Sequence, residues 1–194
     1  METLDGLEIR FFDGPDALEA WLDAHHGRSD GIWVKIAKKS SGIPSVQPDT
    51  MLDVYLCFGW ITGQRRPLDD VHYLQKLTPR RPRSQWSKVN VARVEVLTAA
   101  GRMREAGLAE VRAAQADGRW EAAYESQANA TVPPDLAAAL AADDRARAFF
   151  DSLNRTERYA VIVRLLRSRT PAARQKELER AVARLAAGDK GPRS

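Results

Sequence analysis

The chain has 194 residues and a formal net charge of +4, with 44% hydrophobic and 29% charged residues. This hydrophobic content excludes disorder caused by low hydrophobicity, and the length allows one domain or two small ones. A single cysteine, Cys57, excludes an internal disulfide and a thiolate metal cage. No apolar run reaches the roughly 20 residues of a membrane span, and the acidic N-terminus does not resemble a secretory signal, so we expect a cytoplasmic protein.

The first hundred residues predict alternating strands and helices. Apolar and β-branched residues predict strands at residues 7–12, 31–38, 60–68 and 72–80. Helices are predicted to begin near Pro15, Asp49 and Ser87. A turn at Asp69-Asp70 is expected to join the last two strands. This order predicts an α+β unit with a small mixed or antiparallel sheet.

After Gly101 the strand signals disappear, and the remaining elements are predicted to be helices. Asp144 is a candidate helix cap, and Asn154 with Glu157 has the spacing of a capping box. Thr170 followed by Pro171 indicates the start of a last helix. The predicted fold class is therefore α+β, with a sheet and helices in the N-terminal half and an all-helical C-terminal half. The predicted domains are residues 1–100 and 101–188, with a disordered tail at 189–194.

Charge is distributed unevenly along the sequence. Residues 1–30 contain eight acidic and two basic side chains, whereas residues 155–184 contain nine basic and three acidic ones. A central block, Gly59–Asn90, has seven basic residues against two acidic ones. Such segregation indicates either matching of charges within the molecule or a surface for a polyanion.

The central block contains the strongest candidates for a binding site. The run Thr78–Ser84 holds three arginines next to two prolines, and guanidinium groups form bidentate hydrogen bonds with phosphate and carboxylate. Tryptophans could stack on a ring, and serines before a helix could donate to an anion. The candidate ligand-binding residues are Lys38, Lys39, Trp60, Gln64, Arg65, Tyr73, Arg80, Arg81, Arg83, Trp86, Ser87 and Asn90. In the competing interpretation, the tryptophans belong to the core and the arginines pair with the acidic N-terminal region.

No complete catalytic or metal-binding motif is present in the sequence. His25 and His26 fall at a predicted helix end, where a capping role is the ordinary one, and His72 adjoins the predicted turn. The glycines form neither a dinucleotide fingerprint nor a phosphate-binding loop. We therefore expect no enzyme activity, no cofactor and no metal. An enzyme site would have to bring His72, Gln64 and Arg65 together around a pocket.

The C-terminal helices carry a further group of basic residues, which indicates either a second basic face or a solvated helix surface. This group comprises Arg164, Arg167, Arg174, Lys176, Arg180 and Arg184.

Several long runs resemble the bacterial YdeI/OmpD-associated family. These are KKSSGIPS, LCFGWITGQR and YLQKLTPRRPRSQWSKVN, followed near the end by LNRTERYAVIVRLLRSRTPAARQKELERAVARLAAG. The resemblance extends from about Ile32 to Gly188. It implies a soluble bacterial protein with an α+β front half and a helical back half, and the family name is linked to bacteriocin protection and to an outer-membrane porin. It provides no catalytic residues.

Together these observations predict a non-enzymatic protein that binds an anionic small molecule or a protein partner in a stress or bacteriocin-protection role. The alternative is a nucleic-acid-binding protein that uses the central block and the basic C-terminal helices. Binding to a nucleic acid would weaken steeply with salt, because each neutralised phosphate releases counterions.

Overall fold

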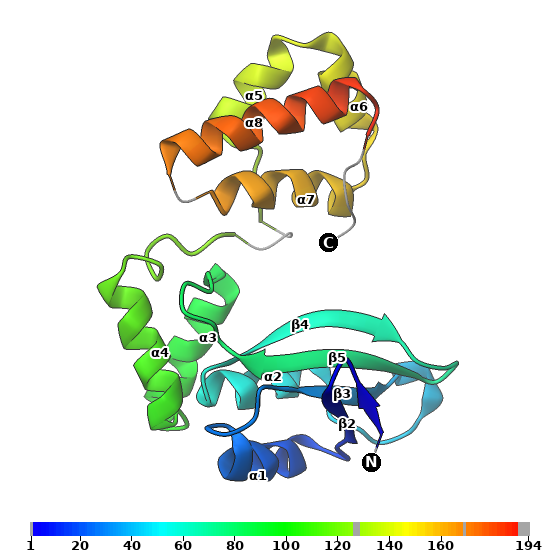
Figure 1. The fold of residues 1–194 in the computed structure, drawn as a ribbon, viewed down its shortest axis with the longest axis vertical. Coiled ribbons are helices and arrows are strands. Elements are labelled where there is room, and N and C mark those ends of the chain that lie inside the picture. The colour runs from blue at the N-terminus through cyan, green and yellow to red at the C-terminus, as the bar shows by residue number, and fades with distance from the viewer. Residues whose placement is uncertain (1, 126–128, 169, 190–194) are drawn as a thin grey trace. The chain divides into compact units, whose positions relative to one another are not determined.

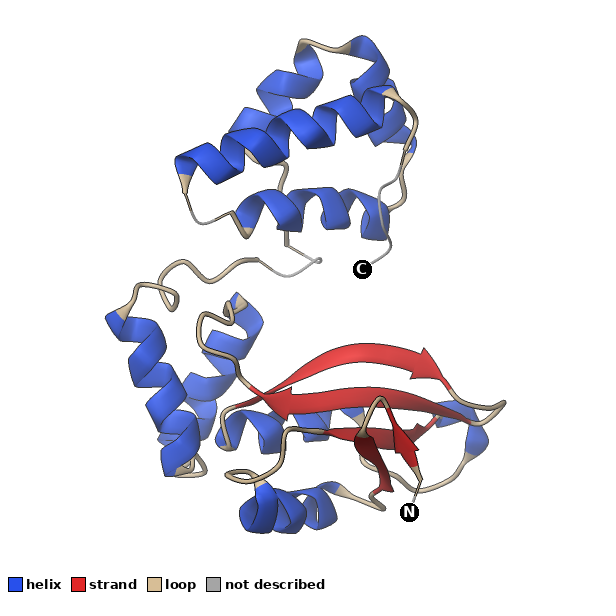
Figure 2. Cartoon of the chain, in the orientation of Figure 1, coloured by secondary structure: helices blue, strands red, loops and turns tan. Residues whose placement is uncertain are grey.

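The computed structural model describes residues 2–125, 129–168 and 170–189, and the chain divides into two compact units. Unit 1 contains residues 1–86 and 90–122, and unit 2 contains residues 87–89 and 123–194. Among the described residues, every strand lies in unit 1, whereas both units contain helices (Figure 2). The predicted boundary at residue 100 falls between two helices of unit 1. Residues 190–194 of the predicted tail lie outside the described residues.

Unit 1 contains a five-stranded sheet and four α-helices. The strands are β1 (Thr3–Leu4), β2 (Leu7–Phe11), β3 (Ile32–Ala37), β4 (Trp60–Pro67) and β5 (His72–Pro79). The helices are α1 (Pro15–His25), α2 (Pro48–Cys57), α3 (Lys88–Ala99, of which the first two residues are grouped with unit 2) and α4 (Glu105–Ala116), with a short 3-10 helix η1 (Lys39–Ser41).

The sheet is mixed, with the order β1-β2-β3-β5-β4. β2 and β3 are parallel and are connected through α1, because a parallel pair needs a crossover. The other neighbouring pairs are antiparallel, including the β4–β5 hairpin. β3 therefore occupies the middle of the sheet.

α1 and α2 lie on one side of the sheet and supply its core (Figure 1). In α1 the buried side chains are Leu18, Trp21 and Leu22, which share one face of the helix at i, i+3 and i+4 spacing. Trp60 at the start of β4 is 1% exposed and packs edge-to-face on Trp21, with ring centroids 5.9 Å apart. Trp60 is thus a core residue.

Among the described residues, no helix of unit 1 covers the opposite face of the sheet (Figure 1). The tryptophan of the central strand, Trp33, is nevertheless shielded from solvent. Trp33 is fully buried, and its indole N–H donates to the Leu4 carbonyl at 3.0 Å. The cations of Arg66 and Lys76 lie 5.1 Å and 5.6 Å from the Trp33 ring centroid. These distances allow cation–π attraction between the two charged groups and the ring.

α4 packs directly against the end of α2 because Gly107 has no side chain. A Cβ at Gly107 would overlap the carbonyl oxygen of Cys57. The backbone N–H of Arg104 also donates to this carbonyl at 3.1 Å, so the first turn of α4 is fixed on the last turn of α2. Cys57 is buried here, and burial raises the pKa of its thiol.

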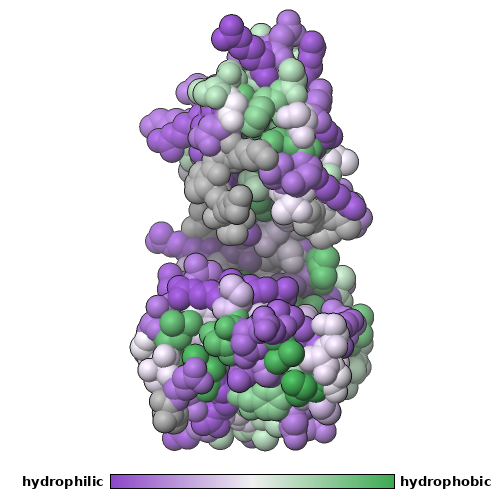
Figure 3. Space-filling model, turned by 90° about the vertical axis from the view of Figure 1, so that its right-hand side faces the viewer, coloured by the Kyte–Doolittle hydropathy of each residue, from purple (hydrophilic) through white to green (hydrophobic). Residues whose placement is uncertain are grey.

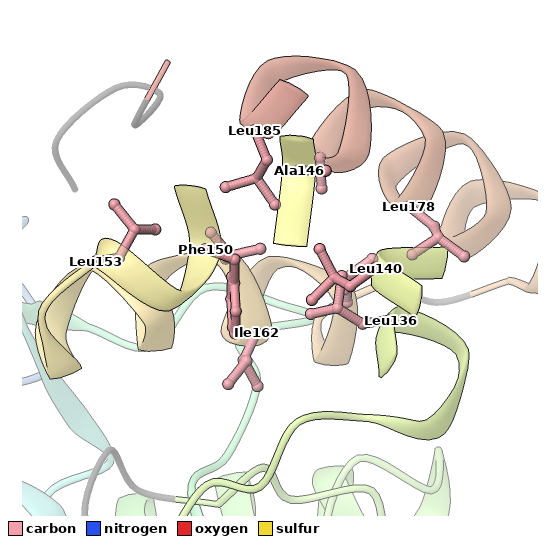
Figure 4. Close-up of a cluster of buried hydrophobic side chains, with 11 residues drawn as sticks. Leu136, Leu140, Ala146, Phe150, Leu153, Ile162, Leu178 and Leu185 are labelled. Atoms are coloured by element: carbon pink, nitrogen blue, oxygen red, sulfur yellow. The ribbon is translucent and has the colours of Figure 1, made fainter. Parts of the chain in front are cut away.

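Unit 2 is a bundle of four short helices, α5 (Pro134–Ala141), α6 (Asp144–Ser152), α7 (Arg155–Leu166) and α8 (Pro171–Ala186). Asn154 and Glu157 form the predicted capping box, and the Thr170 side chain caps α8. The helix cap of α6 is Asp143, so the prediction of Asp144 is wrong by one residue. The helices enclose a cluster of apolar side chains that includes Leu136, Phe150 and Ile162 (Figure 4).

The predicted fold class requires a correction. Helices make up 51% of the described residues and strands 17%, and helices are mixed with strands rather than concentrated in the C-terminal half. α1 and α2 each connect two strands of the sheet, and both α3 and α4 belong largely to the sheet-containing unit. The prediction was wrong because the loss of strand signals after Gly101 does not mark the start of a separate helical half: the last strand already ends at Pro79, and α4 belongs to the same unit as the sheet.

Unit 1 exposes several large apolar side chains. Phe11, Ile43 and Val71 are 42%, 40% and 39% exposed. On the face that Figure 3 shows, hydrophobic side chains are interspersed with hydrophilic ones. Phe11 lies close to Val71, since its ring centroid is 6.4 Å from that of the adjacent His72.

Candidate functional site

The chain leaves β5 through a tight turn, Arg81-Pro82-Arg83-Ser84, which we call the arginine turn. The Ser84 amide donates to the Arg81 carbonyl at 2.9 Å, and the Ser84 hydroxyl accepts from the Arg81 amide at 3.1 Å. Pro82 occupies the second position, where its fixed φ angle favours a turn. Hydrogen bonds and proline together hold this segment in one conformation.

Arg83 has an unusual backbone conformation, with φ = 76°. It occupies the third position of a turn with proline second, where a positive φ defines type II geometry and glycine is the common residue. A side chain in this region costs about 1–2 kcal/mol relative to glycine. Arg81 and Arg83 are both exposed, so the strained turn carries two arginines at the surface.

Four residues pack near the arginine turn or against one another beside it, and we call them the turn floor: Arg80, Trp86, Arg119 and Trp120. Arg80 is only 5% exposed; its guanidinium carbon lies 3.7 Å from the Trp86 ring centroid. It also donates through Nη1 to the Gln85 carbonyl at 3.3 Å. Trp86 is 1% exposed and packs against Trp120 with ring centroids 5.0 Å apart. Arg80 therefore stabilises the segment that carries the exposed arginines.

Arg119 also holds the turn, although the sequence analysis did not identify it. Its Nη1 donates to the Ser84 carbonyl at 2.8 Å, and its Nε bonds both oxygens of Asp117 at 2.8 and 2.7 Å. The side chain of Arg119 is 9% exposed. It lies 35 positions after Ser84 in the sequence, so only the tertiary fold brings the two together.

Trp60 and Trp86 were predicted as stacking surfaces for a ligand. Both are 1% exposed, so neither presents a ring face to solvent in this structure. Trp86 contributes its face to Arg80 instead.

Lys38 and Lys39 lie near the other end of the β4–β5 hairpin. The Lys38 amino group donates to the carbonyls of Asp69 and Asp70 at 3.1 and 2.9 Å, so it stabilises the hairpin turn. Lys39 is exposed on η1. The length of β5, seven residue steps, places this turn roughly 23 Å from the arginine turn.

Gln64, Arg65 and Tyr73 lie between these two ends. Arg65 donates through Nε to the Gln75 side chain at 3.3 Å, and its guanidinium carbon lies 4.4 Å from the Tyr73 ring centroid. The Gln64 side chain accepts from Arg66 at 3.1 Å. The twelve predicted ligand-binding residues therefore do not form one cluster.

Ser87 and Asn90, the last two predicted ligand-binding residues, are half-buried. Ser87 is grouped with unit 2 and Asn90 with unit 1.

His72, Gln64 and Arg65 do not all lie on one face of the sheet. The His72 Nδ1 atom lies 3.0 Å from the Asp69 carboxylate. Several hydrogen bonds lower the pKa of Asp69, and the largest contribution comes from the backbone N–H of Val71. His72 pairs with Ala37 in the sheet, whereas Arg65 pairs with Gln75. Because residues 72 and 75 differ by an odd number, His72 and Arg65 point to opposite faces of the sheet.

The other two histidines cap the end of α1. The Nδ1 atoms of His25 and His26 lie 2.7 Å from the Trp21 carbonyl and 2.9 Å from the Leu22 carbonyl. Within the described residues, no group of three histidine, cysteine or carboxylate side chains is arranged to hold a metal ion.

Acidic residues of the N-terminal region pair with arginines near the start of α4 and on β4. Glu19 on α1 lies 3.1 Å from Arg104 and 3.7 Å from Arg102, and Asp5 lies 2.9 Å from Arg66. Charge matching within unit 1 is therefore real and involves the start of α4 and the edge strand β4.

The C-terminal basic group is also partly paired. Arg174 forms two hydrogen bonds with the Asp135 carboxylate, at 2.6 and 3.0 Å, and Arg184 lies 3.1 Å from Glu177. These two cations stabilise unit 2. Lys176 and Arg180 are exposed on α8.

Comparison with known families gives two matches. Residues 10–110 match a family described as "Domain of unknown function (DUF8412)"; because this is just over half of the chain, the chain belongs to that family. Residues 129–188 match the family "Bacteriocin-protection, YdeI or OmpD-Associated", which confirms the predicted resemblance for this C-terminal segment. The central runs of the predicted resemblance fall within the first match. No curated protein and no solved structure matches the chain.

In the part of the chain that the structure describes, no helix combines the length and the apolar character that a bilayer crossing requires.

Proposed function

We propose that this chain is a non-enzymatic binding protein whose arginine turn recognises an acidic protein partner. The observation that carries the proposal is the positive φ of Arg83. A glycine would fit this position without strain, whereas the arginine adds an exposed guanidinium group at an energetic cost. Residues in strained conformations occur often where their side chains are needed for function.

The turn floor supports this proposal because it makes the turn rigid. Arg80 and Arg119 hold backbone carbonyls on the C-terminal side of the turn, and Ser84 closes it. A rigid turn loses little conformational entropy when it binds. An exposed turn presents its charges to a surface rather than enclosing a small molecule, so we favour a protein partner over a small anion.

A role in bacteriocin protection or a stress response is part of this proposal. It rests on the family description that matches residues 129–188. Binding of an acidic partner is consistent with a protective role without any catalytic step.

The nucleic-acid alternative has less support in the structure. Single-stranded nucleic acids are usually bound by aromatic side chains that stack on bases. Trp33, Trp60 and Trp86 are each no more than 1% exposed, so none of these three rings is available to stack on a base in this structure.

The test compares two variants that each remove one exposed cation from unit 1, Arg83→Ala and Arg28→Ala. A fluorescein-labelled poly-glutamate peptide serves as the acidic probe, and a DNA duplex as the competing one. Loss of charge-assisted hydrogen bonds predicts that Arg83→Ala binds the peptide about tenfold more weakly. Arg28→Ala should bind it nearly as well as the wild type.

Two results would reject the proposal. If both variants lose affinity equally, the attraction is diffuse and the turn has no special role. If DNA binds with a steep salt dependence while the peptide does not bind, the nucleic-acid alternative is correct.

A further inference from the structure

Unit 2 contains a pocket of about 410 Å³ beside the first half of α7. Its apolar lining includes Val132, Leu153 and Ile162. Leu153 and Ile162 are also members of the buried cluster and lie at its margin in Figure 4. The pocket floor is thus part of the packed core of unit 2 and is held in place by it.

The volume is within the range of small-molecule sites, about 300–1,000 Å³. One wall is Tyr159, whose hydroxyl donates to the Glu125 carbonyl at 2.9 Å. This hydrogen bond fixes the ring beside the pocket. An aromatic wall on an aliphatic floor suits an apolar ligand body.

Two arginines add positive charge to this apolar pocket. Arg158 donates through Nε to the Leu153 carbonyl at 3.0 Å and through Nη2 to the Asp151 carbonyl, and its guanidinium carbon lies 5.7 Å from the Phe150 ring centroid. These contacts hold Arg158 in position before any ligand arrives, which lowers the entropic cost of binding. Arg155 lines the same pocket at the first position of α7.

The position of the pocket at the start of α7 also favours a negative group. The partial positive charge at a helix N-terminus attracts anions. The carboxylate of Glu157 is nearby, but it accepts a hydrogen bond from the backbone N–H of Asn154 at 3.0 Å within the capping box. Its negative charge is therefore directed to the backbone. Arginine and the helix terminus therefore act in the same direction.

We propose that this pocket binds a small amphipathic anion, a carboxylate or sulfonate with an apolar body. The apolar body would lie against Leu153 and Ile162, and the anionic group would pair with Arg155 and Arg158. The inference does not depend on the arginine turn, because the pocket is lined by residues of unit 2 alone.

The test uses the full chain and anilinonaphthalene sulfonate, a probe that combines an apolar body with a sulfonate. Val132 is 40% exposed, so Val132→Trp should fill the pocket without disturbing the core. We expect this variant and Arg155→Glu each to weaken probe binding by at least about tenfold. Octanoate should displace the probe from the wild type.

The matched controls are Arg180→Glu on α8, which reverses an exposed charge of unit 2, and Val96→Trp on α3, where Val96 is 59% exposed. Both should bind the probe as the wild type does. The inference is wrong if the wild type does not bind the probe, if Val132→Trp binds it unchanged, or if Arg180→Glu loses as much affinity as Arg155→Glu.

Discussion

The arginine turn and the turn floor contain arginines that are neighbours in sequence but have opposite surroundings. Arg80 is 5% exposed and lies on the Trp86 ring, whereas Arg81, one residue later, is exposed. Burying a guanidinium is unfavourable unless it gains packing and hydrogen bonds. Arg80 gains packing from Trp86 and donates a hydrogen bond to the Gln85 carbonyl. The arginines of the run Arg80–Arg83 therefore fall into two groups. Arg80 stabilises the turn, whereas Arg81 and Arg83 are exposed on it.

The largest effect on stability is expected when the buried tryptophan of the turn floor, Trp86, is removed. Trp86→Ala should lower the free energy of unfolding by about 3–5 kcal/mol, because it leaves a large cavity under Arg80. All five tryptophans of the chain lie in unit 1, so tryptophan fluorescence during urea unfolding follows this unit. A loss below 1 kcal/mol would mean that the floor does not support the turn.

A second test separates Arg80 from Arg81. Arg80→Ala should cost about 2–3 kcal/mol through lost packing and hydrogen bonding, whereas Arg81→Ala should change stability by less than about 0.5 kcal/mol. Both variants remove the same side chain from adjacent positions, and urea midpoints give the difference directly. Equal effects would contradict the division between floor and displayed residues.

Arg174 in unit 2 differs from Arg80 because it pairs with a carboxylate, that of Asp135, whereas Arg80 packs on an aromatic ring. The hydrogen bond from Arg174 is the largest contribution that lowers the pKa of Asp135. Asp135→Asn should cost about 1 kcal/mol at neutral pH.

The pH dependence of this cost follows from the lowered pKa. A depressed folded-state pKa contributes stability that is complete above the unfolded value of about 3.9 and is lost as pH falls through the folded value. The difference between Asp135→Asn and the wild type should therefore disappear in acid. Far-ultraviolet circular dichroism follows the helices of both units, whereas tryptophan fluorescence follows unit 1, so the difference between the two signals reports unit 2. A stability difference independent of pH would exclude the ion pair as its cause.

The smallest expected effect has the opposite sign. Arg83→Gly should raise stability by about 0.5–1 kcal/mol, because glycine adopts the positive φ without strain; the gain is reduced by the greater flexibility of glycine in the unfolded chain. The same variant should bind the poly-glutamate peptide more weakly. Arg81→Gly has no strain to relieve and serves as the control; a destabilised Arg83→Gly would show that the Arg83 side chain has a structural role.

Local signals predicted the local parts of the fold. The alternation of Ile32, Val34 and Ile36 predicted β3, and the spacing of Asn154 and Glu157 predicted the start of α7. These features depend on residues close in sequence, where backbone preferences and hydrogen bonds act directly. The cap of α6 was missed because Asp143 and Asp144 are adjacent and chemically identical.

The candidate site was only partly predictable because burial depends on contacts between distant segments. Nothing in the run Arg80–Ser84 indicates which arginine will lie on a tryptophan. The bond between Arg119 and Ser84 crosses 35 positions, and no motif marks either residue. Likewise, the pocket on α7 combines Val132 with residues of two later segments.

The buried thiol of Cys57, at the end of α2 where α4 packs, can report local opening of unit 1. Cys57 is the sole thiol of the sequence; it is 1% exposed, and the Gly107 backbone lies against its carbonyl. Because the side chain is buried, a thiol reagent reaches it only when unit 1 opens locally, and the raised pKa of the thiol slows the reaction further. Labelling kinetics would measure the opening of unit 1 alone, without contribution from unit 2 and without any engineered probe.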